Sequence, residues 1–253
     1  MGLPYTYRDL RTQKAITEFE QLIQKRNLYQ LTGNLPAPNN TLFQFYASQK
    51  YVPELINTAS DLVFMPDLIA NLLTDKRSTE SCFASTSQLY NPAKREWKSS
   101  LFRLPKVPVD IMQAVAEPGT MIGKLSAPIC QETGMPDNPV VAAATHDTNS
   151  AIAAIPALAD KWAFISTGIW SVMGFENDSS LVNDHSFTLN FTNESNIENT
   201  FDVMKNHMGL WLLQEYRRNW KGSHYSYEQM RPGPPTGSHP GLMAAVHLLM
   251  YIL

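Results

Sequence analysis

The stretch PVVAAATHDTNS, residues 139–150, decides the fold class of this chain. Its first six residues are wholly apolar, which predicts a short strand buried on both faces of a sheet. The polar cluster 145–150 ends that run, and the apolar stretch 151–155 that follows is typical of a helix. Open α/β sheets bind ligands where strands end and helices begin. The order of residues therefore predicts an α/β fold with a site at residues 145–148.

A β-hairpin is expected directly after this site. The runs Trp162–Ser166 and Ile169–Phe175 are rich in aromatic and β-branched residues. The two residues Thr167 and Gly168 separate them, and a two-residue connection containing glycine is typical of a hairpin. Since the character of the chain changes from mixed α/β to hairpin, we predict a domain boundary near residues 156–160.

Helices are predicted on both sides of the central stretch. Apolar residues recur at helical spacing between Ala15 and Lys25, and Pro53 stands at an acceptable first-turn position. The ranges predicted as helices are Ala15–Lys25, Thr41–Gln49, Val52–Ala59, Leu68–Leu73 and Val203–Arg218.

Composition excludes several classes of protein. Charged residues make up 17% of the chain and the net charge is −3, so the basic surface of a nucleic-acid-binding protein is not expected. The two cysteines, Cys82 and Cys130, form no CxxC pair, which argues against a disulfide framework and against a zinc site. No apolar run has the length of a membrane span. These features predict a cytoplasmic protein that binds neither nucleic acid nor membrane.

Two residues of the central stretch are candidates for chemistry. Asp147 precedes an apolar helical stretch, so it is either a helix N-cap or a general base that takes a proton from a substrate hydroxyl. His146 is either a donor to a ligand or a buried histidine with satisfied hydrogen bonds. It has no partner at metal-ligand spacing, so we expect no metal centre made of protein side chains.

Longer motifs carry a resemblance to a known family. The segment Ala144–Thr148 followed by Ile165–Glu176 resembles the FGGY carbohydrate kinases, and within them the branch that acts on L-rhamnulose. Further matching segments occur in the same order between Gly2 and Met230. They are Tyr7–Thr12, Leu31–Gly33, Asn40–Gln44, Met65–Asp67, Thr192–Glu194 and Lys205–Gln214.

The resemblance implies a fold, a reaction and a set of site residues. The fold is the two-domain actin-like (ribonuclease H-like) α/β fold, and the reaction is transfer of phosphate from ATP, with Mg²⁺, to the 1-hydroxyl of L-rhamnulose or a related ketose. By position, Asp147 would be the catalytic base, with His146 and Thr148 beside it at the sugar. Asn206 would contact the sugar, and Gln214 and position 169 would lie on the nucleotide side.

The chain also departs from the family pattern. Ile169 stands where the family branch has a threonine that contacts nucleotide. Residues 1–155 resemble the later part of the N-terminal domain and residues 156–230 the beginning of the C-terminal domain, as in a chain truncated at both ends. Residues 231–253, rich in Pro and Gly and then apolar, resemble an out-of-frame tail. Two hypotheses follow: an L-rhamnulose kinase, or an inactive remnant that binds sugar weakly.

Overall fold

A computed structural model describes Tyr5 and residues 9–159, 161–168, 170–211, 214–215 and 218. The chain divides into two compact units. The first comprises Met1–Ser166 and Met173–Lys205, and the second comprises Thr167–Val172 and Asn206–Leu253. The predicted tail, residues 231–253, lies outside the described residues.

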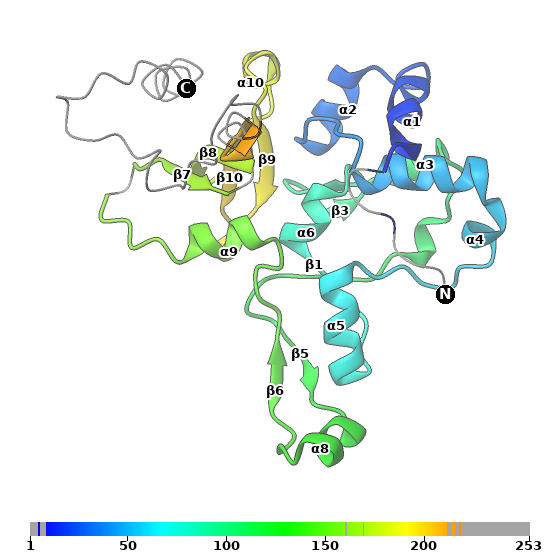
Figure 1. Ribbon diagram of the computed structural model, residues 1–253, viewed down its shortest axis with the longest axis vertical. Coiled ribbons are helices and arrows are strands. Elements are labelled where there is room, and N and C mark those ends of the chain that lie inside the picture. The colour runs from blue at the N-terminus through cyan, green and yellow to red at the C-terminus, as the bar shows by residue number, and fades with distance from the viewer. Residues whose placement is uncertain are drawn as a thin grey trace. The chain divides into compact units, whose positions relative to one another are not determined.

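Five helices follow one another at the start of the first unit (Figure 1), namely α1 Arg11–Phe19, α2 Lys25–Thr32, α3 Thr41–Tyr51, α4 Pro53–Asn57 and α5 Met65–Thr74. The predictions for α3, α4 and α5 are confirmed. The prediction of one helix over Ala15–Lys25 is wrong, because α1 ends at Phe19 and a new helix starts at Lys25. Leu22 is one of the apolar residues at helical spacing between Ala15 and Lys25. It is 51% exposed in the connection between α1 and α2 and does not pack in the core.

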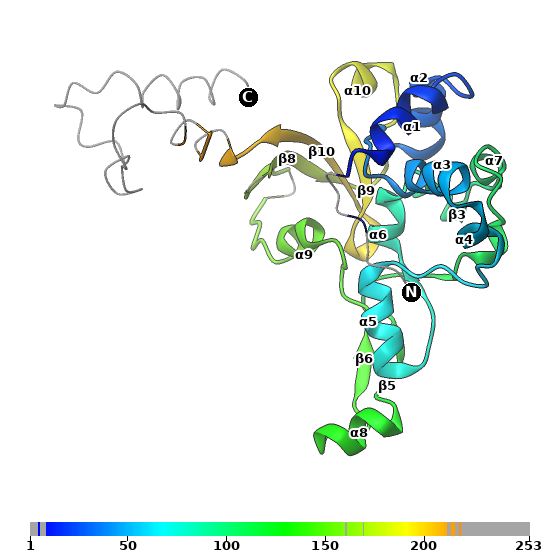
Figure 2. The ribbon, with the colours of Figure 1, turned by 45° about the vertical axis from the view of Figure 1, so that its right-hand side comes forward.

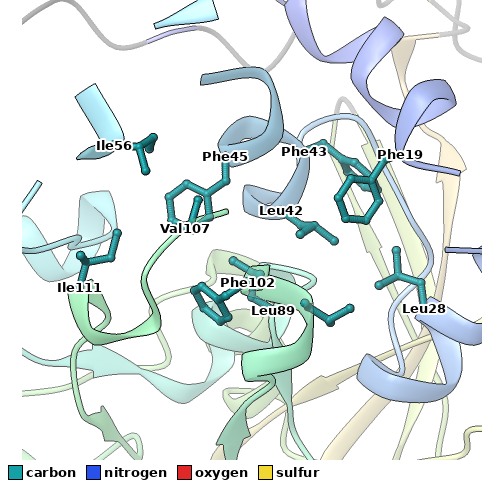
Figure 3. Close-up of a cluster of buried hydrophobic side chains, with 11 residues drawn as sticks. Phe19, Leu28, Leu42, Phe43, Phe45, Ile56, Leu89, Phe102, Val107 and Ile111 are labelled. Carbon is teal, nitrogen blue, oxygen red and sulfur yellow. The ribbon is translucent and has the colours of Figure 1, made fainter. Parts of the chain in front are cut away.

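A hydrophobic core of the first unit lies between helices α1 to α4 and the segment around residues 89–111 (Figure 3). Phe19 of α1 meets Phe43 of α3 edge to face, with ring centroids 5.5 Å apart. Phe102 contacts Phe45 of α3 and, edge to face, Trp97. Buried aromatic rings in these geometries contribute beyond the area that they remove from water. The core therefore holds α1 and α3 together and packs them on the segment 89–111.

Many short elements follow these five helices in the chain. In chain order they are β1 Thr79–Glu80, α6 Ser81–Thr86, β2 Tyr90–Asn91, β3 Glu96–Trp97, α7 Ser99–Arg103, η1 Val109–Ile111, β4 Val115–Ala116, α9 Asp147–Ala153, α10 Asp184–Thr188 and η2 Ile197–Asn199. Strands β1 and β4 pair in parallel, and β2 and β3 pair antiparallel.

The strand in the apolar run 139–144 is shorter and more exposed than predicted. Strand β6 covers only Pro139–Val141 and pairs antiparallel with β5, Met121–Lys124. Helix α8, Ala127–Thr133, joins the two strands, and α5 lies beside them in both ribbon views (Figures 1 and 2). Val141 is 52% exposed, so the prediction of burial on both faces is wrong. A two-stranded hairpin has too few neighbours to bury both faces, whatever its composition.

Four strands between residues 164 and 208 form one sheet. Its strands are β7 Phe164–Thr167, β8 Trp170–Asn177, β9 Thr192–Ser195 and β10 Phe201–Met208, in the order β7-β8-β10-β9. The neighbouring strands β7 and β8 confirm the predicted hairpin. The helix predicted over Val203–Arg218 is wrong up to Met208, because β10 pairs antiparallel with β9 and buries Val203 and Met204. Pairing and burial override the local helical pattern.

The segment after β8 returns to pack on helix α2. The Tyr29 hydroxyl donates to Ser186 Oγ at 2.9 Å, and both the backbone and side-chain nitrogens of Asn193 donate to the Gly33 carbonyl at 3.0 Å. Gly33 ends α2 in the left-handed conformation, with φ +75°. The bonded residues Tyr29 and Ser186 are 157 positions apart in the chain, and Gly33 and Asn193 are 160 apart. These contacts therefore hold the segment around β9 against a much earlier part of the chain.

Replacing Gly33 with alanine is expected to destabilise this junction by about 1–2 kcal/mol, because an L-residue pays that amount in the left-handed region. The new Cβ would also lie 3.2 Å from Asn193 Cβ and from Val182 Cγ2. The free energy of unfolding in urea measures the loss. Gly134→Ala is the control for backbone strain alone, since φ is +72° there and nothing lies within 4 Å of its Cβ position. A loss at Gly33 no larger than at Gly134 would rule out the packing contribution.

Both Cys82 and Cys130 are free. Within the part of the chain that the structure describes, no helix is both long enough and apolar enough to cross a membrane.

Candidate active site

The central polar cluster lies at the start of helix α9. His146 is the N-cap residue and makes no side-chain capping bond, and Asp147 is the first residue of the helix. The hypothesis that Asp147 is the N-cap is therefore wrong, because the N-cap is the preceding residue, His146. The Asp147 carboxylate accepts a hydrogen bond from the Thr148 backbone N–H at 2.8 Å. It lies in the first turn of the helix, where a negative charge is favourable.

Asp147 is free to meet a substrate. Its side chain is 97% exposed, and its Oδ1 lies 3.8 Å from Nε2 of His146. Thr148, next along the helix, is half-buried. A general base has to reach the proton that it removes, and an exposed carboxylate meets that requirement. The predicted residues His146, Asp147 and Thr148 are consecutive in the chain and lie at the start of α9 in the first unit.

The His146 ring is held from the protein side through its Nδ1 atom. This nitrogen lies 2.8 Å from Oε2 of Glu194 on β9 and 2.6 Å from Oδ1 of Asn149 on α9. The ring is 29% exposed. The negative charge of Glu194 raises the pKa of His146 to about 9, against the opposing effect of burial. The contacts of Nδ1 support the hypothesis of a histidine with satisfied hydrogen bonds. The hypothesis that the ring donates to a ligand stays a prediction, and its other nitrogen, Nε2, lies near Asp147.

A buried amide connects this histidine to strand β10. The side-chain nitrogen of Asn149 donates to Asp202 Oδ2 at 2.8 Å and to the Ser195 carbonyl at 3.1 Å. Asn196 donates to the other carboxylate oxygen of Asp202 at 3.0 Å. Burial, followed by the charge of Glu194, raises the pKa of Asp202 to about 7. The network therefore ties α9 to both β9 and β10.

A second buried carboxylate holds the turn before α9. Glu80, which is wholly buried, caps helix α6 by accepting from the backbone N–H groups of Cys82 at 2.6 Å and Phe83 at 3.2 Å. The same carboxylate accepts from the backbone N–H of Thr145 at 3.0 Å and from its hydroxyl at 2.7 Å. One side chain thus joins the start of α6 to the residue immediately before His146.

The other predicted site residues belong to the second unit. Asn206 is exposed on β10, and Gln214 donates its backbone N–H to the Leu210 carbonyl at 3.0 Å. Leu210 N–H in turn donates to the Gly168 carbonyl at 3.0 Å. A Cβ on Gly209 would lie 2.6 Å from that same carbonyl oxygen, so the two backbones meet closely at a position that only glycine fits. Ile169 lies outside the described residues.

The described residues contain no group of three or more His, Cys, Asp and Glu side chains that would hold a metal. The resemblance implies Mg²⁺ bound together with ATP, and the phosphates of such a substrate commonly supply ligands to this ion. Gly168, exposed at the turn between β7 and β8, offers a backbone without a side chain, and Gln214 offers an amide. When bound, the ion would neutralise phosphate charge.

The His146 environment predicts a loss of stability at alkaline pH. Its folded pKa of about 9 is above the ordinary value of 6.5, so the stabilisation is complete below pH 6.5 and is lost as pH rises toward 9. We expect the free energy of unfolding to fall by on the order of 2–3 kcal/mol across that window. Urea titrations at pH 6 and pH 9 measure the change. His146→Gln should reduce the dependence, leaving the part that Asp202 contributes through its own raised pKa. The matched variant His185→Gln should keep the dependence in full, and equal slopes in both variants would contradict the assignment.

Sequence reasoning missed the side chains that support the site. It assigned no role to Glu80, Asn149, Glu194 or Asp202, although Glu194 was part of a matching segment. Glu80 and Thr145 are 65 residues apart in the chain, and His146 and Glu194 are 48 apart. A local pattern carries no signal for contacts at such separations. The Glu80 cap of α6 is the one local feature that was open to recognition, as an acidic residue before a helix.

The chain is similar to known proteins along most of its length. The family described as "FGGY family of carbohydrate kinases, N-terminal domain" matches residues 5–154. Among curated proteins, the rhamnulokinase of Enterococcus faecalis is 36% identical over 227 residues, which are 90% of this chain and 45% of that protein. The rhamnulokinase of Halalkalibacterium halodurans is 36% identical over 225 residues, 89% of this chain and 48% of that protein. The chain thus spans about half the length of these relatives.

Solved structures share the fold at low sequence identity. The gluconate kinase from Lactobacillus acidophilus aligns with a TM-score of 0.76 at 13% identity, covering 89% of this chain and 45% of that one. The glycerol kinase of Plasmodium falciparum with ADP aligns with a TM-score of 0.70 at 13% identity, covering 83% and 44%. These neighbours confirm the actin-like α/β sugar kinase fold, which the chain covers in part.

Proposed function

Because the chain belongs to the FGGY family of carbohydrate kinases, we propose that it contributes the sugar-side catalytic residues of an L-rhamnulose kinase that uses ATP and Mg²⁺. The observation that carries the proposal is the exposed Asp147 carboxylate, 3.8 Å from the His146 ring at the start of α9. The rhamnulokinase names of relatives 36% identical to this chain support L-rhamnulose as the sugar. The cytoplasm, where ATP is abundant, is the proposed compartment.

The proposed reaction needs little covalent chemistry from the protein. The 1-hydroxyl of the sugar gives its proton to Asp147 as its oxygen attacks the γ-phosphorus of ATP, and the bond from that phosphorus to the ADP oxygen breaks. Phosphoryl transfer of this kind depends chiefly on positioning and on neutralising charge. We assign His146 and Thr148, at the start of α9, to positioning the sugar, and the family resemblance assigns Asn206 to the sugar as well. Gln214 and position 169 are assigned to the nucleotide.

Sugar binding without turnover is the second candidate function. The observation that favours it is Ile169, an alkyl side chain where the family branch has a nucleotide-contacting threonine. Loss of a hydroxyl costs about 0.5–1.5 kcal/mol per hydrogen bond. That amount weakens nucleotide binding about 10-fold at most and leaves the sugar side unchanged.

ADP release in a coupled assay, with each sugar added separately, tests the proposal. We expect release that depends on L-rhamnulose and is lower with xylulose, gluconate and glycerol, the sugars or sugar derivatives of other kinases with this fold. Calorimetric titration with L-rhamnulose in the absence of ATP separates the two candidates. Binding heat without ADP release supports the second candidate, and neither signal with any of these compounds would reject both.

A further inference from the structure

The strongest feature that the proposed function leaves unused is the set of side chains behind His146. Glu194 has only 10% of its side chain exposed, and Asn149 is wholly buried. Little of either side chain is exposed for a sugar to contact. An oxygen of each lies within hydrogen-bonding distance of the same histidine nitrogen. A buried polar group destabilises the folded protein unless it has well-placed hydrogen-bond partners. The hydrogen bonds around them define the protonation of the ring.

The orientation of the Asn149 amide follows from its partners. Its nitrogen faces the Ser195 main-chain carbonyl at 3.1 Å, and a carbonyl oxygen only accepts. The amide nitrogen must therefore point there and toward Asp202, which places the Asn149 oxygen against Nδ1 of His146. A flipped amide would set its oxygen against the carbonyl of Ser195. The buried strand neighbour thus fixes which end of Asn149 meets the histidine.

The protonation of Nδ1 follows in turn. The Asn149 oxygen and the Glu194 carboxylate are both acceptors, at 2.6 Å and 2.8 Å from Nδ1. A bare Nδ1 between them would leave lone pairs facing lone pairs in a partly buried site. The hydrogen therefore resides on Nδ1, and the nitrogen that faces Asp147 is Nε2.

We propose that Glu194 is a positioning residue of this kinase site, which, together with Asn149, holds His146 with its Nδ1 protonated and Nε2 as the donor beside Asp147. The role rests on the proposed function, in which His146 meets the sugar. An Nε2–H donor and a carboxylate acceptor 3.8 Å apart complement a hydroxyl, which accepts from the ring while it donates to Asp147. A positively charged ring keeps Nε2 a donor, and the carboxylate of Glu194 maintains that charge.

The charged groups around the ring come from more than one element. Glu194 faces it from β9 and Asp147 from α9. Asp202 of β10 reaches it through Asn149, and Glu80 holds the preceding residue, Thr145. Of these, only Glu194 contacts Nδ1 directly, so its removal should change the ring without removing any group that faces the sugar.

Nitrogen-15 spectra of the imidazole rings of the whole chain provide the direct test. The His146 signal is assigned by its absence in His146→Gln. In the unaltered chain we expect Nδ1 to be protonated at every pH studied and Nε2 to titrate well above the ordinary range. A neutral ring protonated on Nε2 would overturn the proposal, and this result needs no variant to fold.

Glu194→Gln tests the role of the carboxylate. We expect the His146 pKa to fall by roughly one to two units, because a neighbouring opposite charge is lost. Glu176→Gln is the matched control, since Glu176 lies on β8 of the same sheet and bonds Thr200 at 2.6 Å. It should leave the His146 spectrum unchanged. An unchanged titration in Glu194→Gln, or an equal change in both variants, would overturn the proposal, and should Glu194→Gln fail to fold, the spectra of the unaltered chain decide.

Sugar phosphorylation provides the functional measurement. We expect kcat/KM in Glu194→Gln to fall about 10–100-fold, mostly in KM at low pH and in both parameters as the ring loses its charge. Glu176→Gln should retain the original pH profile. Absence of phosphorylation in the unaltered chain would count against the proposed function alone, because the nitrogen-15 spectra test the positioning of His146 without turnover.

Discussion

Replacing Asp147 with asparagine is expected to lower L-rhamnulose phosphorylation by about 10²–10⁴-fold, the contribution of a general base. The amide is nearly the same size as the carboxylate but accepts no proton from the sugar hydroxyl. Folding should change little, because the side chain is 97% exposed and, among the described residues, its contacts are the adjacent backbone N–H and the His146 ring 3.8 Å away. The reduction should therefore appear in kcat, with little change in the urea midpoint.

A matched control for this variant exists in the same chain. Asp184 is the first residue of α10, as Asp147 is of α9, and 65% of its side chain is exposed. Asp184→Asn should leave phosphorylation unchanged, with at most a small loss of stability from its exposed ion pair with Arg26. Equal turnover in Asp147→Asn and the unaltered chain would show that the base lies elsewhere.

Replacing Glu80 with alanine is expected to reduce the free energy of unfolding by about 3–5 kcal/mol. The wholly buried carboxylate accepts from the backbone of Cys82, Phe83 and Thr145 and from the Thr145 hydroxyl. Each donor left buried without a partner costs about 1–3 kcal/mol, and water entering the cavity recovers part of the total. Urea unfolding followed by tryptophan fluorescence measures the loss as a lower midpoint.

The control for Glu80 is a carboxylate beside it in the same region. Glu117 accepts from Ser81 at 2.9 Å and pairs with Arg95, and 35% of its side chain is exposed. Glu117→Ala should cost no more than about 1 kcal/mol, because solvent replaces its partners. A loss in Glu80→Ala as small as that in Glu117→Ala would mean that the buried donors find other partners, and that Glu80 does not hold the Thr145 turn.

Local patterns predicted a substantial part of the fold. Helices α3, α4 and α5 and the β7–β8 hairpin formed where apolar spacing, Pro53 and Gly168 indicated. Such elements are stabilised by contacts within a few residues, so a short window contains the relevant information. The motif at residues 145–148 likewise identified the candidate site.

The errors occurred where distant residues override the local pattern. Strand β10 replaced a predicted helix because β9 pairs with it. Strand β6 was short and exposed because β5 is its only strand partner among the described residues. The domain boundary near residues 156–160 stays a prediction, as do the roles assigned to Asn206, Gln214 and Ile169. Neither composition nor periodicity reports which strand neighbours which.

The sequence by itself determined the family, the candidate base and the residues beside it, because these depend on residue identity and order along a short segment. Only the tertiary structure decided which groups surround Nδ1 of His146, the burial of Glu80 and the exposure of Asp147. These properties depend on the local dielectric and on hydrogen-bond partners 48 and 65 residues away in the chain. Folding brings those partners within 3 Å, where a charge or an unpaired donor matters most.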